Sequence, residues 1–237
     1  NDVLEMSRIE AGGLGLHESA FELHRLIHEI EDMFRLRVSE KGLSFDVTGV
    51  ATVPQHVRAD ESKLRQILIN LLGNAVKFTQ EGGVSLRLQR GEESLITDKT
   101  EVIFEIEDTG AGIDDSEIEK IFLPFVQARA GIQSQQGTGL GLPLSRQFAR
   151  LMNGDISAKS GMKGGALFTA KIWLSKARPD EVPEPKQTRR ISNIAPGQPE
   201  YRILIAEDRW ENRKLLELLL TPLGFLVRSA ANGEEAI

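Results

Sequence analysis

The chain has 237 residues, of which 40% are hydrophobic and 27% charged, with a formal net charge of −6 and no cysteine. The lack of cysteine excludes a disulfide-stabilised secreted domain and any cysteine-based zinc or redox site. No uncharged apolar run approaches the roughly 20 residues that cross a bilayer. The acidic balance argues against nucleic acid as a partner, because phosphate contacts need clustered Lys and Arg. We therefore expect a soluble cytoplasmic chain of one or two domains that makes no membrane contact itself, whether or not its parent protein is membrane-anchored.

Apolar spacing predicts alternating helices and strands along most of the chain. Ser19 is expected to cap the second helix and Asp60 the third. The stretch from Pro179 to Pro199 holds five of the nine prolines, which predicts a linker. In chain order, the predicted elements are a helix end over residues 1–11, a helix over 19–42, a strand over 43–47, a helix over 60–78, strands over 84–88 and 102–106, a helix over 142–152, strands over 155–159 and 166–174 and, after the linker, a strand over 203–206 and a helix through residue 220.

The helix predicted over residues 60–78 carries a polar stripe beside its apolar face. Two members of the stripe are mid-helix asparagines, which are poor helix formers because their side chains compete for backbone hydrogen bonds. Two neutral amides and an ammonium on one line could hold a hydrated magnesium ion and the phosphates attached to it. The alternative is a stripe that is simply solvated. The stripe consists of Lys63, Gln66, Asn70, Asn74 and Lys77.

An acidic residue and two glycines follow the strand predicted over residues 102–106. In this run, Asp108-Thr-Gly110-Ala-Gly112-Ile113, the glycines allow a sharp turn that lets the carboxylate of Asp108 face a cleft. Such a carboxylate can accept a hydrogen bond from the exocyclic amine of adenine, with the glycines leaving room for the flat base. A plain glycine-rich turn is the alternative. A calcium loop matches poorly, because the alternate acids that it needs are missing.

Glycine recurs at every second position directly before the helix predicted over residues 142–152. The run is Gly137-Thr138-Gly139-Leu140-Gly141-Leu142, followed by Pro143. Amide groups exposed at a helix N-terminus favour anions, and proline suits the first helical turn. The run is not a Walker A motif, because no Gly-Lys-Ser/Thr occurs, and its third glycine is one residue early for a dinucleotide fingerprint. A phosphate site is therefore favoured over a flexible linker.

Together and in this order, the motifs resemble the nucleotide-binding boxes of sensor histidine kinases. The resemblance extends from about His17 to Leu174. It implies a catalytic ATP-binding domain with an α/β sandwich fold, in which helices cover one face of a mixed sheet, as in ATPases of the gyrase and chaperone type. The matching segments are residues 70–79 for the N box, 108–113 for the first glycine box, 121–127 for the F box and 137–142 for the second glycine box.

The resemblance also implies roles for individual residues. It makes Asn74 a ligand of the magnesium ion of ATP, with Asn70 near the same ion, and it brings Lys77 to the phosphates; these three would be the catalytic residues. The carboxylate of Asp108 would bind the adenine amine. The implied ATP-binding residues are Asn74, Lys77, Phe78, Asp108, Gly110, Gly112, Ile113, Phe122, Gly137, Thr138, Gly139, Leu140, Gly141 and Leu142.

The residue type at position 70 bears on the reaction. Related ATPases of the gyrase, mismatch-repair and chaperone type carry a glutamate base where Asn70 stands. An amide cannot act as that base, so phosphoryl transfer to a positioned acceptor is favoured over hydrolysis. A lid over about residues 126–136, anchored by Phe122 and Phe125, is also implied, but Gln133-Ser-Gln-Gln replaces the family's Thr-Arg pair there. The alternatives are a degenerate kinase domain that acts as a signalling adaptor and a hydrolytic ATPase of the gyrase class.

The N-terminal part of the chain resembles the catalytic domain of these kinases together with the segment that precedes it. Residues 1–14 resemble the end of the dimerisation hairpin, and residues 15–177 would be the catalytic domain, followed by a linker over 178–200. None of the four histidines has the His-Glu-x-x-x-Pro setting of a phosphoacceptor, so that histidine is expected upstream. The implied partners are ATP, this histidine and a second copy of the parent protein in a homodimer.

The C-terminal part resembles the beginning of a receiver domain. The run from Ile203 to Asn212 resembles its first strand and acidic pocket, with Glu207 and Asp208 as an incomplete metal site. Residues 201–237 would then be a truncated receiver domain, and a receiver domain or response regulator would be a further partner. A piece of this size cannot bury its own sheet, so we expect it to be poorly ordered or ordered only by packing on a neighbour.

Overall fold

The computed structural model describes residues 4–7, 15–94, 98–126, 138–161, 164–183, 198–208 and 210–236. The chain divides into two compact units, Asn1–Pro183 and Glu184–Ile237. The motifs that resemble the nucleotide-binding boxes all belong to the first unit.

The described residues of the first unit form, after a helical piece at residues 4–7, a seven-stranded sheet and three long helices. The elements are β1 (Ser19–Glu22), α2 (Leu23–Glu40), β2 (Ser44–Thr48), η1 (Val50–Thr52), β3 (His56–Ala59), α3 (Glu61–Phe78), β4 (Gly83–Glu93), β5 (Lys99–Asp108), η2 (Lys120–Phe122), α5 (Gly141–Leu151), β6 (Asp155–Ser160), β7 (Ala166–Lys176) and η3 (Pro179–Glu181).

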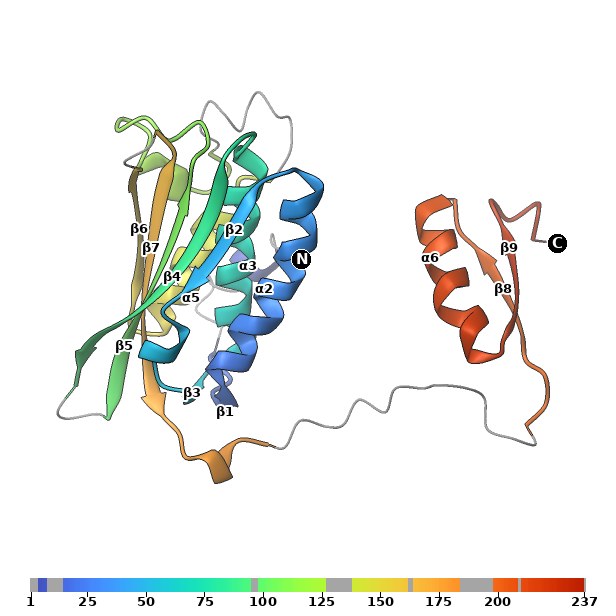
Figure 1. Ribbon diagram of the computed structural model, residues 1–237, viewed down its shortest axis with the longest axis horizontal. Helices are drawn as coiled ribbons and strands as arrows, with labels where there is room; N and C mark the ends of the chain where they lie inside the picture. Colours follow the sequence, from blue (N-terminus) through green and yellow to red (C-terminus); the bar gives the residue numbers. More distant parts are fainter. Residues whose placement is uncertain are drawn as a thin grey trace. The chain divides into compact units, whose positions relative to one another are not determined.

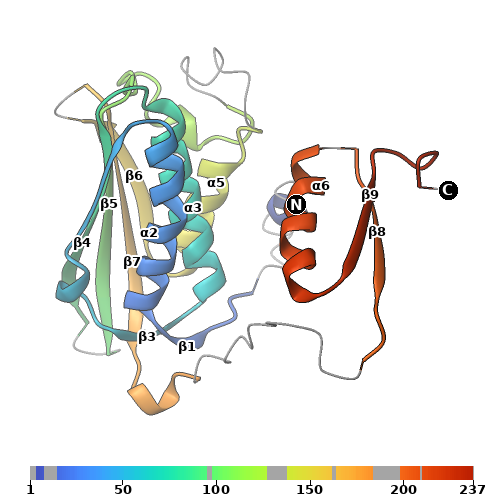
Figure 2. The ribbon, with the colours of Figure 1, turned by 45° about the vertical axis from the view of Figure 1, so that its right-hand side comes forward.

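The sheet is mixed, and the helices cover one of its faces. The strand order is β1-β3-β7-β5-β4-β2, with β6 also paired to β7. Strands β2 and β4 run parallel, and the other pairs are antiparallel. Helices α2, α3 and α5 lie on the same side of the sheet in both ribbon views (Figures 1 and 2). This confirms the fold expected from the sequence.

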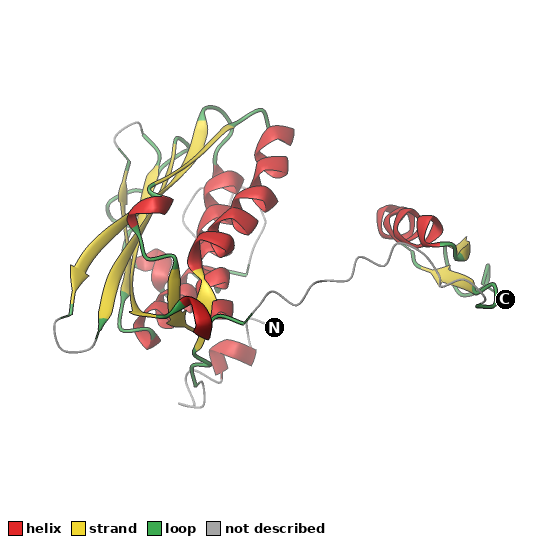
Figure 3. Ribbon diagram, turned by 60° about the horizontal axis from the view of Figure 1, so that its bottom comes forward, coloured by secondary structure: helices red, strands yellow, loops and turns green. Residues whose placement is uncertain are grey.

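The core lies between the sheet and the helices. Figure 3 shows these two layers from another direction. Along β5, the fully buried side chains of Val102, Phe104 and Ile106 alternate with more exposed ones such as Glu105. This is the period of a strand with one covered face. The apolar stripe of α3 is buried against that face, as its spacing predicted. Its members are Leu64, Ile67, Leu68, Leu71, Leu72, Ala75 and Val76.

Both ends of α3 are held by side-chain hydrogen bonds. At the start, the carboxylate of Asp60 accepts from the backbone N–H of Lys63 at 3.1 Å, so the predicted cap is confirmed. At the end, Nζ of Lys41 donates to the carbonyls of Val76 at 2.7 Å, Lys77 at 3.2 Å and Thr79 at 3.4 Å. These bonds satisfy backbone groups that a helix terminus leaves open. The helix that carries the polar stripe is therefore fixed at both ends.

The prediction that Ser19 caps a helix is wrong. Residues Ser19–Glu22 form strand β1, which pairs antiparallel with β3 so that Phe21 lies opposite Val57. The side chain of Phe21 is 2% exposed and that of Val57 is fully buried. Strand pairing and burial of this apolar pair outweigh the helical spacing that Phe21 shares with the residues after it. Helix α2 consequently begins at Leu23.

In the second unit, the described residues form one parallel strand pair and a helix. Its elements are β8 (Arg202–Ala206), α6 (Trp210–Leu220), η4 (Thr221–Leu223) and β9 (Leu226–Ala230), and β8 pairs with β9. Strand β9 was not among the predicted elements. Large apolar side chains remain exposed in this unit, namely Leu204, Leu216, Leu218, Leu219 and Leu226. That this segment needs a neighbour to become ordered stays a prediction. Within the described residues of both units, no helix combines the length and the hydropathy that spanning a membrane would require.

Candidate nucleotide site

The polar stripe of α3 is divided into two parts. In the first part, the carboxylate of Glu5 accepts from Nζ of Lys63 at 2.8 Å and from Nε2 of Gln66 at 3.0 Å. Burial by itself raises the pKa of Glu5, but these two bonds outweigh it and leave the pKa lowered. The helical piece at residues 4–7 therefore occupies this part of the stripe. The second part, with Asn70, Asn74 and Lys77, lies nearer the glycine-rich segments.

Asn70 joins the stripe to the second glycine box. Its Nδ2 donates to Oγ of Ser145 in α5 at 2.7 Å. A Cβ placed on Gly141, the first residue of α5, would lie only 2.5 Å from Oδ1 of Asn70. This distance is far below that of ordinary packing, so a side chain at position 141 would displace the Asn70 amide from its place beside the start of α5. The N-terminus of α5 and the polar stripe are therefore brought together, as the sequence predicted.

Asn74, Lys77 and Phe78 lie at the end of α3 beside the first glycine box. A Cβ on Gly110 would lie 2.4 Å from the carbonyl oxygen of Phe78, which shows how closely the two segments pass. Nζ of Lys77 lies 4.7 Å above the ring of Phe78. The side chain of Asn74 is half-buried. Within the described part of the chain, it makes no hydrogen bond, so its amide is available to a ligand.

Asp108 is the last residue of β5, and its side chain is 5% exposed. Its Oδ1 accepts from the backbone N–H of Gly110 at 2.8 Å and from that of Ala166 at 3.3 Å. Burial raises the pKa of Asp108 above its usual range, and these two N–H groups offset the shift only in part. Since both bonds end on Oδ1, Oδ2 is the atom that can accept from a ligand.

Two glycine-rich turns enclose Asp108. A Cβ on Gly165 would lie 1.8 Å from the backbone oxygen of Asp108, and one on Gly112 would lie 2.4 Å from the carbonyl oxygen of Gly164. Neither position has room for a side chain. Ile113 follows in the first turn and packs partly buried against the core. The structure therefore brings the predicted residues of the first glycine box around the carboxylate.

The F box meets the second glycine box through the backbone. The N–H of Phe125 donates to the carbonyl of Gly139 at 3.0 Å. Phe122 is 8% exposed and Phe125 is 70% exposed. That these two residues anchor a lid stays a prediction. Gly137 and the lid residues after Val126 lie outside the described residues.

The start of α5 presents the remaining predicted residues. Oγ1 of Thr138 accepts from the N–H of Leu140 at 3.3 Å, and the side chain of Leu140 is fully buried. Leu142 packs partly buried against the core. Leu140 precedes the helix without a side-chain cap. The first N–H groups of α5 are therefore free of a side-chain cap, an arrangement that suits an anion.

Some residues that contribute to this region were not expected. The hydroxyl of Ser145 and the N–H of Ala166 bind predicted residues, and the guanidinium of Arg146 lies 4.6 Å above the ring of Phe122. Arg146 also makes a two-point hydrogen bond to Asp155, at 2.8 and 3.2 Å. One signal was present in the sequence, because Ser145 is a polar residue on the otherwise apolar face of a helix.

The predicted acidic pair of the second unit, Glu207 and Asp208, follows strand β8. The N–H of Glu207 donates to the carbonyl of Ala230 at 3.1 Å. Across the described residues of the chain, no group of three or more His, Cys, Asp or Glu side chains could hold a metal ion. A metal role of Glu207 and Asp208 stays a prediction.

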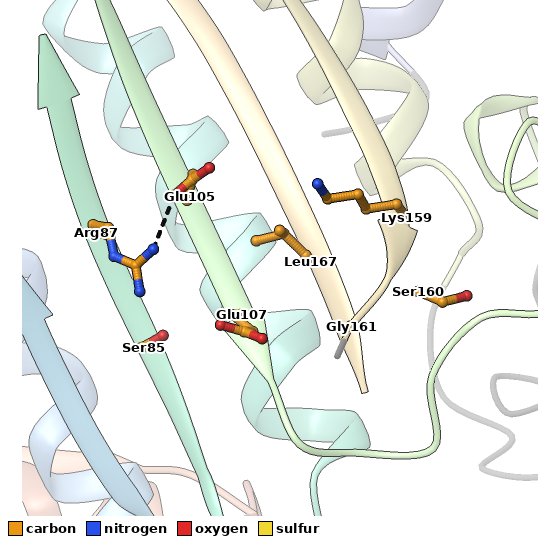
Figure 4. Close-up of a pocket in the computed structure, with 8 residues that line it drawn as sticks. All are labelled: Ser85, Arg87, Glu105, Glu107, Lys159, Ser160, Gly161 and Leu167. Atoms are coloured by element: carbon orange, nitrogen blue, oxygen red, sulfur yellow. Dashed lines mark hydrogen bonds and ion pairs between the residues drawn. The ribbon is translucent and has the colours of Figure 1, made fainter. Parts of the chain in front are cut away.

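A hollow of about 150 Å³ lies on the other face of the sheet (Figure 4). Oγ of Ser160, which lines it, donates to the carbonyl of Ile113 in the first glycine box at 3.0 Å. The charged side chains of the hollow have both signs, and Nη1 of Arg87 lies 3.4 Å from the carboxylate of Glu105. It contains none of the residues predicted to bind a nucleotide. The residues that line it are Ser85, Arg87, Glu105, Glu107, Lys159, Ser160, Gly161 and Leu167.

Comparison with known proteins identifies the class. Residues 59–176 match the family model described as histidine kinase-, DNA gyrase B-, and HSP90-like ATPase. The whole chain is 32% identical to two-component system protein A of Emericella nidulans and 36% identical to the circadian input-output histidine kinase CikA of Synechococcus elongatus. It spans 36% and 30% of the length of these relatives.

A solved structure agrees with this assignment. Full-length ShkA in complex with AMPPNP superimposes with a TM-score of 0.62 and 27% identity, over 100% of this chain and 45% of that one. The chain belongs to the family of histidine kinase-, gyrase B- and HSP90-like ATPases. Within that family, it carries the ATP-binding catalytic core of a sensor histidine kinase of the hybrid type.

Proposed function

We propose that the first unit binds magnesium-ATP between α3, the turns around Asp108 and the start of α5, and presents the γ-phosphate to a histidine outside this chain. The observation that carries the proposal is the convergence of three motifs. Gly141 lies against Asn70, and Gly110 lies against the end of α3, so α3 joins the segments that carry the amides, the carboxylate and the helix N-terminus. Each motif alone could be a solvated stripe, a glycine-rich turn or a linker. Because the structure brings the three close together, a shared ligand is favoured.

The donor set fits a nucleotide with its metal. Amide oxygens, such as those of Asn70 and Asn74, are hard ligands that suit magnesium, which keeps several waters and binds through few protein groups when phosphates supply the charge. Oδ2 of Asp108 is left to accept from the exocyclic amine of adenine. Bound magnesium would neutralise charge on the phosphates, and Lys77 and the N–H groups of α5 would add to this.

The chemistry asked of the chain is positioning rather than acid–base catalysis. The imidazole nitrogen of the acceptor histidine forms the new N–P bond as the bond between the γ-phosphorus and the bridging oxygen breaks, and ADP leaves. The histidine supplies the nucleophile, so no water needs to be activated. Asn70 cannot remove a proton from water, and this supports transfer over hydrolysis.

The other parts of the chain suit the same protein. We assign residues 1–14 to the end of a dimerisation hairpin, 15–177 to the catalytic domain, 178–200 to a linker and 201–237 to part of a receiver domain. The parent protein would act as a cytoplasmic homodimer that passes phosphate to a receiver domain or response regulator. The parallel βαβ arrangement of β8, α6 and β9 supports the receiver assignment.

Calorimetric titration with ATP and MgCl₂ tests the binding site. Asp108→Asn is expected to weaken affinity by roughly tenfold to a hundredfold, because a hydrogen bond to a charged group contributes about 1.5–3 kcal/mol. Asn74→Ala is expected to weaken it in the same direction. Glu107→Gln is the matched control, since this neighbouring carboxylate lines the hollow on the opposite face of the sheet. Equal affinity in all four proteins would contradict the proposal.

Phosphoryl transfer needs a longer chain of the same protein that includes the histidine-bearing hairpin. Incubated with γ-labelled ATP, it should acquire acid-labile phosphate on histidine, and Asn70→Asp should lower the rate. Steady phosphate release by the present chain at an enzyme-like rate would instead support a hydrolytic ATPase. Tight ATP binding without transfer would support an adaptor.

A further inference from the structure

Ser145 is a buried hydroxyl that the proposed reaction does not use. It lies in α5 among buried apolar residues, next to Leu144 and one turn from Phe148 and Ala149, and is 2% exposed. A hydroxyl in such surroundings is unfavourable unless it is hydrogen-bonded. Its partner is Nδ2 of Asn70, 2.7 Å away on a different helix. The bond therefore links α5 to the polar stripe of α3.

In the structure, this bond occupies the nitrogen end of the Asn70 amide and leaves the oxygen end for the nucleotide space. An asparagine amide has an oxygen that binds cations and a nitrogen that only donates hydrogen bonds. With Nδ2 directed to Ser145, Oδ1 is the amide atom nearer to Gly141, at 2.5 Å from where a Cβ of Gly141 would stand, against 2.9 Å for Nδ2. Gly141 is the first residue of α5, so the oxygen lies beside the N–H groups expected to meet the phosphates.

We propose that Ser145 is a positioning residue that holds the Asn70 amide with its oxygen turned toward the metal of the bound nucleotide. The inference rests on the proposed function, because it requires magnesium-ATP in this site. The terminal torsion of asparagine is broad and roughly two-fold, so without the hydroxyl the amide can turn its nitrogen toward the cation. Loss of a residue that orients a metal ligand typically lowers metal affinity about 10–100-fold.

A purely structural role makes a different prediction. If the bond served only to join α3 and α5, its loss would lower stability and would weaken ATP binding equally with and without magnesium. The two roles are therefore separated by the magnesium dependence of ATP affinity, expressed as the Kd measured in EDTA divided by the Kd measured in MgCl₂.

The experiment is calorimetric titration of ATP into the whole chain under these two conditions. Ser145→Ala is expected to lower the ratio about tenfold while the Kd in EDTA stays within about twofold of wild type. Ser145→Cys keeps the volume but offers a weak acceptor, so it should lower the ratio by a smaller factor and serves if the alanine variant folds poorly. The control is Thr100→Val, which removes a fully buried hydroxyl that has no hydrogen-bond partner among the described residues and should leave the ratio unchanged.

A second readout needs no nucleotide. In an ¹H–¹⁵N spectrum, the side-chain amide signal of Asn70, assigned by its absence in Asn70→Asp, should move in Ser145→Ala and stay in place in Thr100→Val. A wild-type magnesium ratio in Ser145→Ala, or an equal rise of both Kd values, would overturn the inference and leave the proposed function standing. If wild type does not bind ATP, or binds it without regard to magnesium, the proposed function falls and this inference falls with it.

Discussion

Gly165→Ala tests whether the two glycine-rich turns approach each other as closely as the structure shows. The added Cβ would lie 1.8 Å from the backbone oxygen of Asp108, where ordinary contacts begin near 3.4 Å, and 2.8 Å from its Oδ1. The oxygen belongs to β5, which is paired on both sides, so the strand cannot easily move away. The variant should therefore lose both stability and the geometry of the carboxylate.

The magnitude follows from the kind of overlap. Overpacking of a protein interior typically lowers stability by about 1–3 kcal/mol. We expect Gly165→Ala to lower it by about 3 kcal/mol, because the added methyl group overlaps backbone that cannot easily move. For a unit of this size, that corresponds to a fall in Tm of roughly 6–12 °C. ATP affinity should fall as well, because the displaced Oδ1 accepts from the N–H groups of Gly110 and Ala166.

The assay is thermal unfolding followed by circular dichroism, together with calorimetric titration of ATP. Gly73→Ala is the matched control: this glycine lies inside α3 with no atom within 4 Å of an added Cβ. It should raise stability by about 0.5–1 kcal/mol, because alanine favours a helix interior. A Gly165→Ala variant that melts within about 2 °C of wild type and binds ATP as tightly would refute the reasoning.

Three further substitutions have expected outcomes. Asp108→Asn should raise the Tm of the nucleotide-free protein at neutral pH. Because the pKa of the Asp108 carboxyl is raised in the folded state, the stability that this carboxyl contributes is present below its unfolded-state pKa and is lost as pH rises through its folded-state pKa. Thermal melts at pH 4 and 7 check this, and a lowered Tm at pH 7 would contradict it. Lys41→Met should destabilise the protein by about 1 kcal/mol in urea unfolding, because three carbonyls at the end of α3 lose their donor. Its control, Arg35→Met, removes an exposed ion pair within α2 and should change stability by less than about 0.5 kcal/mol. Equal effects of the two substitutions would count against a capping role of Lys41. Thr100→Val should stabilise the protein by about 1 kcal/mol, because it removes a buried hydroxyl for which the described part of the chain offers no partner; a destabilised variant in the same urea assay would point to a partner for that hydroxyl.

The sequence predicted the long elements well because their signals are local. Apolar spacing over α3, with Asp60 as its cap, located that helix to within a residue or two, and the spacing before Met152 located α5. It failed at β1, a strand of four residues whose apolar side chains also fit the period of the following helix. Only the antiparallel pairing of Phe21 with Val57 decides between the two, and that pairing joins residues far apart in the chain.

The site likewise combines features that are local in the sequence with contacts between residues far apart in the chain. The residue types of Asn70, Asn74 and Asp108, and the glycines around them, could be recognised from the sequence because they lie within short motifs. The partners that orient them could not. Ser145 lies 75 residues from Asn70, and Ala166 lies 58 residues from Asp108.

By itself, the sequence determined the class of protein, the helices and strands that carry the motifs, and the chemical groups available to a nucleotide. The tertiary structure decided which of those groups meet and which way they face. Local patterns record the period and the ends of an element, whereas the direction of an amide or a carboxylate depends on packing of α3 against α5 and on the register of β5 with β7.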